Sequence, residues 1–216
     1  MIEKLKKTFN FKKADWTALV LIAITLIWQF GSYFISKLAV TNFHVVNSDI
    51  DNYIPFIKYF VVFYVVWYAM IFIVPFMISR RDRGLFHVYI ITYNLMFLAA
   101  LITFIVYPTI VEIPELKTTD FFTWLMNFIY AKDYPPINCL PSGHTMACTL
   151  MIYGTAICKK MKPSSKTIIM IINILTMCST VFTKQHALID LVFALIYTTV
   201  IFIIVWLIYN KVYKKS

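Results

Sequence analysis

Residues 186–209 read HALIDLVFALIYTTVIFIIVWLIY, and this run decides the class of the protein. It contains no Lys, Arg or Glu, and its polar ionisable groups, His186 and Asp190, stand together at one end. A helix needs about 20 mostly apolar residues to cross the hydrocarbon core of a bilayer. The run therefore predicts a membrane-spanning helix with a histidine and a carboxylate at one membrane surface.

Five further apolar stretches precede this one. They cover residues 16–40, 55–79, 85–107, 141–158 and 167–182. Hydrophobic residues make up 61% of the chain and charged residues 14%, whereas a soluble domain has about 45–50% and 25%. The composition excludes an ordinary soluble protein. We expect an all-α integral membrane protein, a bundle of six transmembrane helices that forms one domain over residues 1–216.

The distribution of basic residues predicts the orientation of this bundle. Fifteen of the 20 Lys and Arg residues fall in four segments, which alternate along the chain as the segments on one side of a six-span protein must: 1–15, 80–83, 159–166 and 211–216. Cytoplasmic segments carry an excess of Lys and Arg. We therefore expect a multi-pass protein of the cell membrane with both termini in the cytoplasm. The N-terminal cytoplasmic part is the basic segment at residues 1–15. The net charge of +10 then reflects topology, and no nucleic-acid partner is needed to explain it.

The longest segment on the opposite side is an extracytoplasmic loop at residues 108–140. Within it, residues 120–130 are aromatic and amphipathic. This pattern is typical of a helix that lies in the membrane interface, but it also fits the aromatic belt found at any membrane surface. Both interpretations stay open at this point.

The cysteines and histidines show no metal-binding spacing. The four cysteines, Cys139, Cys148, Cys158 and Cys178, form no Cys-x-x-Cys pair, and only Cys139 falls in the extracytoplasmic region. We therefore expect no structural disulfide, no metal ligands and no cofactor.

Two histidines are brought to one membrane face by the predicted topology. His144 stands at the outer end of the fourth span and His186 at the outer end of the sixth. His186 and Asp190 have i, i+4 spacing, which places them in contact range on one helix face. A carboxylate there can accept the Nδ1 proton of the imidazole and leave Nε2 as a nucleophile or base. These three residues are the predicted catalytic groups.

Other residues near the two histidines suit an anion. Lys184 adds a cation two residues before His186. Ser142 and Gly143 precede the fourth span, and the free N–H groups at a helix N-terminus attract phosphate. We predict that Lys184, Ser142 and Gly143 bind a phosphate between the two histidines.

At these residues the sequence resembles the type 2 phosphatidic acid phosphatase (PAP2) superfamily, whose motifs are Lys-x6-Arg-Pro, Pro-Ser-Gly-His and Ser-Arg-x5-His-x3-Asp. Residues 141–144 match the second motif, and Ser179, His186 and Asp190 match the third at the right spacing. Residues 107–109, 138–139 and 183–186 resemble more narrowly the Thr-Lys-Gln-His branch that includes inositol-phosphorylceramide-synthase-like members.

The sequence departs from the superfamily at two places. Thr180 stands where many members have Arg, a charge that Lys184 would supply in this branch. In the first motif, Ile113-Pro114 replaces Arg-Pro, and Lys117 is displaced from the expected position.

The resemblance implies a membrane lipid-phosphate phosphatase that needs no metal. His186 would form a phosphohistidine, Asp190 would orient it, and His144 would protonate the leaving oxygen and then activate water. A reactive centre at the outer surface suits a lipid phosphate with its tail in the bilayer. Two alternatives remain: a phosphotransferase that moves a phospho-headgroup between lipids, and a non-catalytic membrane lipid-binding protein.

Overall fold

The computed structural model describes residues 13–40 and 42–213, which are mostly helical. Much of the predicted basic segment at residues 1–15 lies outside this range, as do Lys214 and Lys215 of the tail. The α-helices are α2 (Lys13–Ala39), α3 (Asp49–Tyr53), α4 (Val61–Arg81), α5 (Arg83–Val106), α6 (Phe121–Asp133), α7 (Gly143–Ile157), α8 (Pro163–Phe182) and α9 (Leu188–Tyr213). A 3₁₀ turn, η1 (Lys58–Phe60), and two short strands, β1 (His44–Val45) and β2 (Thr109–Ile110), complete the chain. The all-α prediction is confirmed for the described residues.

Five of the described helices are long and apolar enough to cross a membrane, which indicates a multi-pass membrane protein. They span Asp15–Leu38, Lys58–Arg81, Arg83–Val106, Pro163–Phe182 and Leu188–Val212. The remaining predicted span corresponds to α7, which has 15 residues. At a rise of 1.5 Å per residue it is about 22 Å long, shorter than the hydrocarbon core of about 30 Å.

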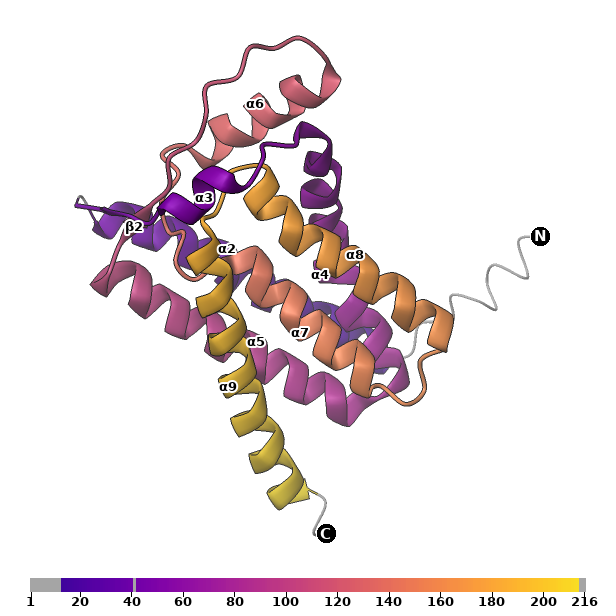
Figure 1. Ribbon diagram of the computed structural model, residues 1–216. Coiled ribbons are helices and arrows are strands. Elements are labelled where there is room, and N and C mark those ends of the chain that lie inside the picture. Colours follow the sequence, from indigo (N-terminus) through magenta and orange to yellow (C-terminus); the bar gives the residue numbers. More distant parts are fainter. Residues whose placement is uncertain (1–12, 41, 214–216) are drawn as a thin grey trace.

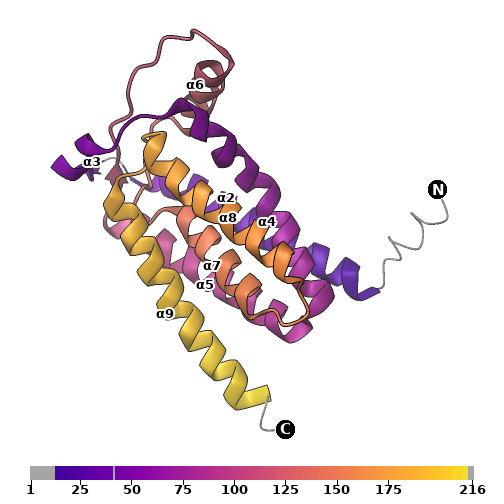
Figure 2. The same ribbon diagram turned by 45° about the vertical axis from the view of Figure 1, so that its right-hand side comes forward.

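Helix α7 is enclosed by other helices. It packs against α4, α5, α8 and α9, and in both views it lies in the middle of the bundle (Figures 1 and 2). Gly154 permits this close packing: a Cβ atom there would lie 2.8 Å from Ile78 of α4 and 3.1 Å from Tyr89 of α5. A helix enclosed in this way need not match the thickness of the bilayer with its own length.

Basic residues gather at one end of the bundle. Arg80 and Arg83 both pair with Asp15 at the start of α2, at 3.3 and 3.4 Å. Near the far end of α9, Tyr209 packs against Gly84 beside the same connection. The α7–α8 connection, with Lys159, Lys160 and Lys162, lies at this end too (Figure 1).

The opposite end carries the irregular segments and α6. Strands β1 and β2 pair in parallel, with His44 opposite Thr109, and so join the segments that follow α2 and α5. Helix α6 begins with a capping box between Asp120 and Thr123. Its exposed face carries Phe121, Trp124 and Phe128, whose rings stack at 5.8 and 6.0 Å. The predicted amphipathic helix is thus present, slightly longer than expected.

Candidate active site

His144 is held in the first turn of α7. Ser142 is the N-cap residue, and its hydroxyl accepts a hydrogen bond of 3.3 Å from the N–H of Thr145. The N–H of Ser142 donates to the carbonyl oxygen of Asp190 at 3.2 Å. This bond ties the start of α7 to the start of α9, and with it His144 to the segment that carries His186.

His186 lies in the tight connection between α8 and α9. The N–H groups of Gln185 and His186 both donate to the carbonyl oxygen of Thr180, at 2.9 and 3.1 Å. Lys184 adopts a left-handed backbone conformation with φ of 56°, which only a few per cent of non-glycine residues do. This reversal of the chain turns His186 toward α7.

Asp51, in the segment after β1, holds the other side of this connection. Its Oδ1 accepts a hydrogen bond of 2.7 Å from the N–H of Leu188, the first residue of α9, and its Oδ2 accepts bonds of 2.9 and 2.8 Å from Ser48. Burial raises the pKa of Asp51, but these hydrogen bonds outweigh it, so its pKa is lowered overall. Asp51 was not singled out from the sequence.

The predicted histidine–aspartate pair forms. His186 Nδ1 lies 3.1 Å from Oδ2 of Asp190, and the N–H of Ala187 donates to the same oxygen at 3.0 Å. Asp190 is fully buried, and its Oδ1 has no hydrogen-bond partner among the described residues. With Nδ1 engaged by the carboxylate, Nε2 is the ring nitrogen left for a substrate.

His144 faces this pair from α7. Its ring centroid lies 6.2 Å from that of His186. Tyr64 and Trp67 of α4 contact the ring at centroid distances of 4.3 and 4.1 Å and fix its orientation. His144 Nε2 is buried without a hydrogen-bond partner among the described residues, so a proton donor or acceptor is available there for a bound group.

A cavity of about 220 Å³ opens between the two histidines. Residues of α2, α4, α5, α6 and α7 line it, together with the loop before α7 and the α8–α9 connection. Its aromatic lining residues are Phe30, Tyr33, Phe34, Tyr64, Trp67, Tyr68, Phe97 and Phe104. The cavity thus combines an apolar wall with a polar corner that contains both histidines.

Asp133 is a polar residue of this corner that sequence reasoning did not single out. The hydroxyl of Tyr64 lies 3.2 Å from its Oδ2 and 3.1 Å from Oε1 of Gln185. Burial raises the pKa of Asp133, while the bond from Tyr64 and the charges of His186 and Lys37 oppose that rise. Its place at the end of an amphipathic helix, shortly before the Pro-Ser-Gly-His segment, is the signal that could have found it.

The three predicted phosphate-binding residues have different positions. Gly143 lines the cavity, whereas Ser142 and Lys184 are not among its lining residues. The amine of Lys184 instead donates to the carbonyl oxygens of Asp51 and Ile54, at 2.7 and 2.6 Å. Among the described lining residues, Lys132 is the only Lys or Arg.

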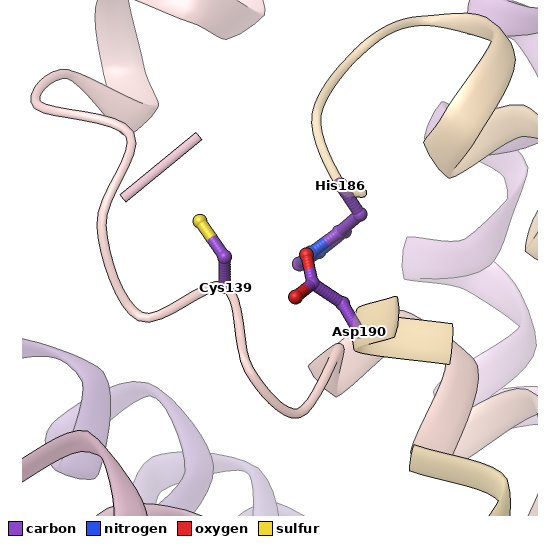
Figure 3. Close-up of side chains that lie close together, drawn as sticks. All are labelled: Cys139, His186 and Asp190. Carbon is purple, nitrogen blue, oxygen red and sulfur yellow. The ribbon is translucent and has the colours of Figure 1, made fainter. Parts of the chain in front are cut away.

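Cys139 joins the pair from the loop that leads into α7. One ligand atom each from Cys139, His186 and Asp190 lies within 4.8 Å of the others, and Figure 3 shows the cysteine opposite the other two side chains. Burial, and next the charge of Asp190, raise the pKa of the Cys139 thiol well above its usual value. The sequence predicted no metal ligands because residues 139, 186 and 190 have no recognisable spacing. All four cysteines are free, as expected.

The sequence model of the PAP2 superfamily matches residues 112–214, which include α6–α9 and the site residues His144, His186 and Asp190. No curated protein and no solved structure matches the chain. Superfamily members generally act as phosphatases on phosphate esters.

Proposed function

We propose that this chain belongs to the PAP2 superfamily and is a membrane lipid-phosphate phosphatase that works through a phosphohistidine on His186. The observation that carries the proposal is the pairing of His186 with Asp190 while His144 stands 6.2 Å away across a cavity. The family match over residues 112–214 supports the same reaction class.

The geometry suits an in-line displacement. A nucleophile attacks from about 3–3.5 Å, and a general acid works from about 2.6–3.2 Å. We propose that the phosphate binds with its phosphorus toward His186 and its leaving oxygen toward His144. His186 Nε2 attacks phosphorus, the bond to the leaving oxygen breaks, and His144 gives that oxygen a proton. Water then attacks the phosphohistidine, His144 takes a proton from this water, and inorganic phosphate leaves.

Asp190 and nearby donors assist these steps. Asp190 fixes the tautomer of His186 and stabilises the positive charge that the ring gains on phosphorylation. Gly143 and Lys132 line the cavity, and we assign to them contacts with the non-bridging oxygens. Ser142 supports this corner as the helix cap of α7. Lys184 supports it through its hydrogen bonds to two carbonyl oxygens, which hold the α8–α9 connection.

We infer a lipid substrate from the position and lining of the cavity. Aromatic side chains of α2, α4 and α5 form its wall, and five of the described helices are long and apolar enough to cross a membrane. A phosphate with an apolar tail can place the tail along this wall and the phosphate between the histidines. We further infer six crossings, with both termini in the cytoplasm and the active site on the extracytoplasmic side, because the basic residues of the α4–α5 and α7–α8 connections lie at the end remote from the histidines.

The cavity has few cations, since Lys132 is the only Lys or Arg among its described lining residues. This observation favours two alternatives to a phosphatase. A weak phosphate clamp suits a transferase that passes the phospho-headgroup to a second lipid, or a lipid-binding protein without catalysis. A transferase yields a new lipid from a labelled acceptor, and a binder forms no phosphohistidine.

The test is a panel of lipid phosphates assayed with the full chain in detergent micelles, for the wild type, His186→Ala, His144→Ala and Asp190→Asn. We expect the wild type to release phosphate from at least one lipid and each variant to lose it by about 10²–10⁴-fold, the range that acid–base groups contribute. Each variant should elute as a folded monodisperse protein. Wild-type release by folded His186→Ala would overturn the proposal.

A further inference from the structure

Two atoms at the histidine–aspartate pair have no part in the proposed reaction. Asp190 Oδ1 is buried and lacks a hydrogen-bond partner among the described residues, and the thiol of Cys139 makes only a weak bond of 3.2 Å to the carbonyl oxygen of Pro136. A buried carboxylate oxygen without a partner is costly. The carboxylate of Asp190 and the thiol of Cys139 each have a ligand atom within 4.8 Å of the other. A ligand that binds both groups would give the unpartnered oxygen a partner.

The three side chains are arranged as a chelating group. Their ligand atoms lie within 4.8 Å of one another, and the side chains of Cys139 and Asp190 are buried. In Figure 3 one carboxylate oxygen of Asp190 lies against the ring of His186, and the other turns toward the side of Cys139. The three residues come from two separate segments, so the group exists only in the folded protein.

The donor set selects one class of cation. Thiolate, imidazole and carboxylate are the zinc donors, with bond lengths of about 2.0–2.3 Å. Tetrahedral bonds of that length place donors roughly 3.5 Å apart, so the group must contract by about 1 Å. Cys139 lies in an irregular segment rather than a helix, which makes this shift feasible. A thiolate ligand disfavours Mg²⁺ and Ca²⁺, which take oxygen donors.

We propose that Cys139, His186 and Asp190 form an inhibitory site for a thiophilic divalent cation such as Zn²⁺. Binding forms a sulfur–metal bond as the thiol proton passes to solvent, and a water molecule fills the fourth position. No oxidation or reduction is involved. The inhibition rests on the proposed function, whereas the binding itself does not.

Inhibition follows whichever ring nitrogen of His186 binds the metal. A metal on Nε2 occupies the atom that attacks phosphorus. A metal on Nδ1 removes the hydrogen bond that Nδ1 donates to Asp190, which fixes the tautomer. In both cases His186 cannot form the phosphohistidine until the metal leaves, so a chelator should restore activity.

The first test measures binding without any activity assay. Co²⁺, which occupies zinc sites and gives a thiolate-to-metal charge-transfer absorption, is titrated into the full chain in detergent. We expect this absorption in the wild type and in Cys178→Ser, where a partly exposed thiol of α8 is removed as a matched control. We expect no such absorption in Cys139→Ser or Cys139→Ala. Two variants are used so that the test remains valid if one of them does not fold. Absence of the absorption in the wild type, or its persistence in folded Cys139→Ser, overturns the site.

The second test measures inhibition of phosphate release. Zn²⁺ should inhibit the wild type and Cys178→Ser alike, EDTA should reverse this, and the inhibitory concentration should rise roughly tenfold or more in Cys139→Ser, since one of three protein ligands is lost. Equal inhibition of Cys139→Ser and the wild type overturns the inhibitory role. A wild type that binds Co²⁺ through Cys139 but releases no lipid phosphate refutes the phosphatase and leaves the metal site standing.

Discussion

Lys132 and Lys184 are near neighbours of the site with different surroundings. Lys132 lines the cavity and is exposed, whereas the amine of Lys184 is bonded to two carbonyl oxygens of the α3 segment. A charged hydrogen bond is worth about 1.5–3 kcal/mol. The two residues therefore contribute to different properties, one to phosphate binding and the other to the stability of the α8–α9 connection.

Replacement of each lysine by methionine separates these contributions. For Lys132→Met we expect KM to rise about tenfold with little change in the melting temperature. For Lys184→Met we expect the melting temperature to fall, because two carbonyls lose their partner, and kcat to fall more than KM rises. Steady-state kinetics and thermal unfolding of both variants make the comparison. A raised KM with unchanged melting temperature in Lys184→Met would return Lys184 to the phosphate-binding role predicted from the sequence.

Asp133 gives a pH dependence of stability whose sign follows from its environment. Burial raises its pKa above the usual 3.8, so the unfolded chain releases this proton at a lower pH than the folded chain does. As pH rises from 3.8 through the raised pKa of the folded state, the free energy of unfolding therefore decreases. Asn keeps an oxygen that can accept the bond from Tyr64 and has no charge to bury.

We expect Asp133→Asn to be at least as stable as the wild type at pH 7, with less loss of stability between pH 4 and pH 7. Thermal unfolding at both pH values in one detergent measures this. Asp49→Asn serves as the control, since Asp49 is exposed. A variant that loses more stability than the wild type over this range would show that Asp133 is stabilised as a carboxylate.

The proximity of the candidate catalytic residues could be predicted from the sequence because they sit at fixed local spacings. His186 and Asp190 are only four residues apart, and His144 belongs to the Pro-Ser-Gly-His segment, so a short stretch of sequence identifies each of them. The roles of Asp51, Asp133 and Cys139 depend on contacts between segments remote in sequence. No periodicity indicates such contacts. The hydrogen bonds of the Lys184 amine could not be predicted for the same reason, since their partners lie some 130 residues away.

At the level of elements, hydropathy located each long helix but not its ends. The second predicted span begins at Pro55, yet α4 begins at Val61 after the 3₁₀ turn η1. The fifth begins at residue 167, yet α8 begins at Pro163, because proline suits the first turn of a helix and polar residues there face water. Asp82 caps α5 through a 2.9 Å bond from the N–H of Leu85. The 3₁₀ turn before α4, the proline at the start of α8 and the cap of α5 coincide with these boundaries, and hydropathy does not report any of them.

The central position of α7 gives a prediction for two glycines. Gly154 meets Ile78 and Tyr89 closely, whereas nothing lies within 4 Å of a Cβ atom at Gly31 in α2. Insertion of extra carbon atoms into a packed core costs about 1–3 kcal/mol. At an open helical position, replacement of glycine by a good helix former gains roughly 0.5–1 kcal/mol.

We therefore expect Gly154→Leu to lower the melting temperature and Gly31→Leu to leave it unchanged or raise it. Thermal unfolding in detergent compares the two variants with the wild type. Equal tolerance of leucine at both positions would contradict the enclosure of α7 by α4 and α5.

At the scale of the whole molecule, the distribution of basic residues is the basis for the proposed orientation of the bundle in the membrane. The α4–α5 and α7–α8 connections, which contain basic residues, lie at one end of the bundle. Helix α6, the start of α7 and the α8–α9 connection lie at the other end (Figure 2), and the last two contain His144 and His186. The sequence predicted this separation because loop charge depends on composition alone. It did not predict that the chain encloses one helix of 15 residues, since a buried core helix and a membrane span have similar hydropathy.

The orientation can be tested with single cysteines on the two ends. Thr118 and Lys160 are both exposed, the first in the segment before α6 and the second in the α7–α8 connection. Because Lys and Arg favour the cytoplasmic side, a membrane-impermeant maleimide should label Thr118→Cys in intact cells and should label Lys160→Cys only after the membrane is opened. The wild type measures labelling of the four native cysteines, three of which are buried. Labelling of Lys160→Cys in intact cells, with Thr118→Cys protected, would place the histidines on the cytoplasmic side and require a substrate pool in that leaflet.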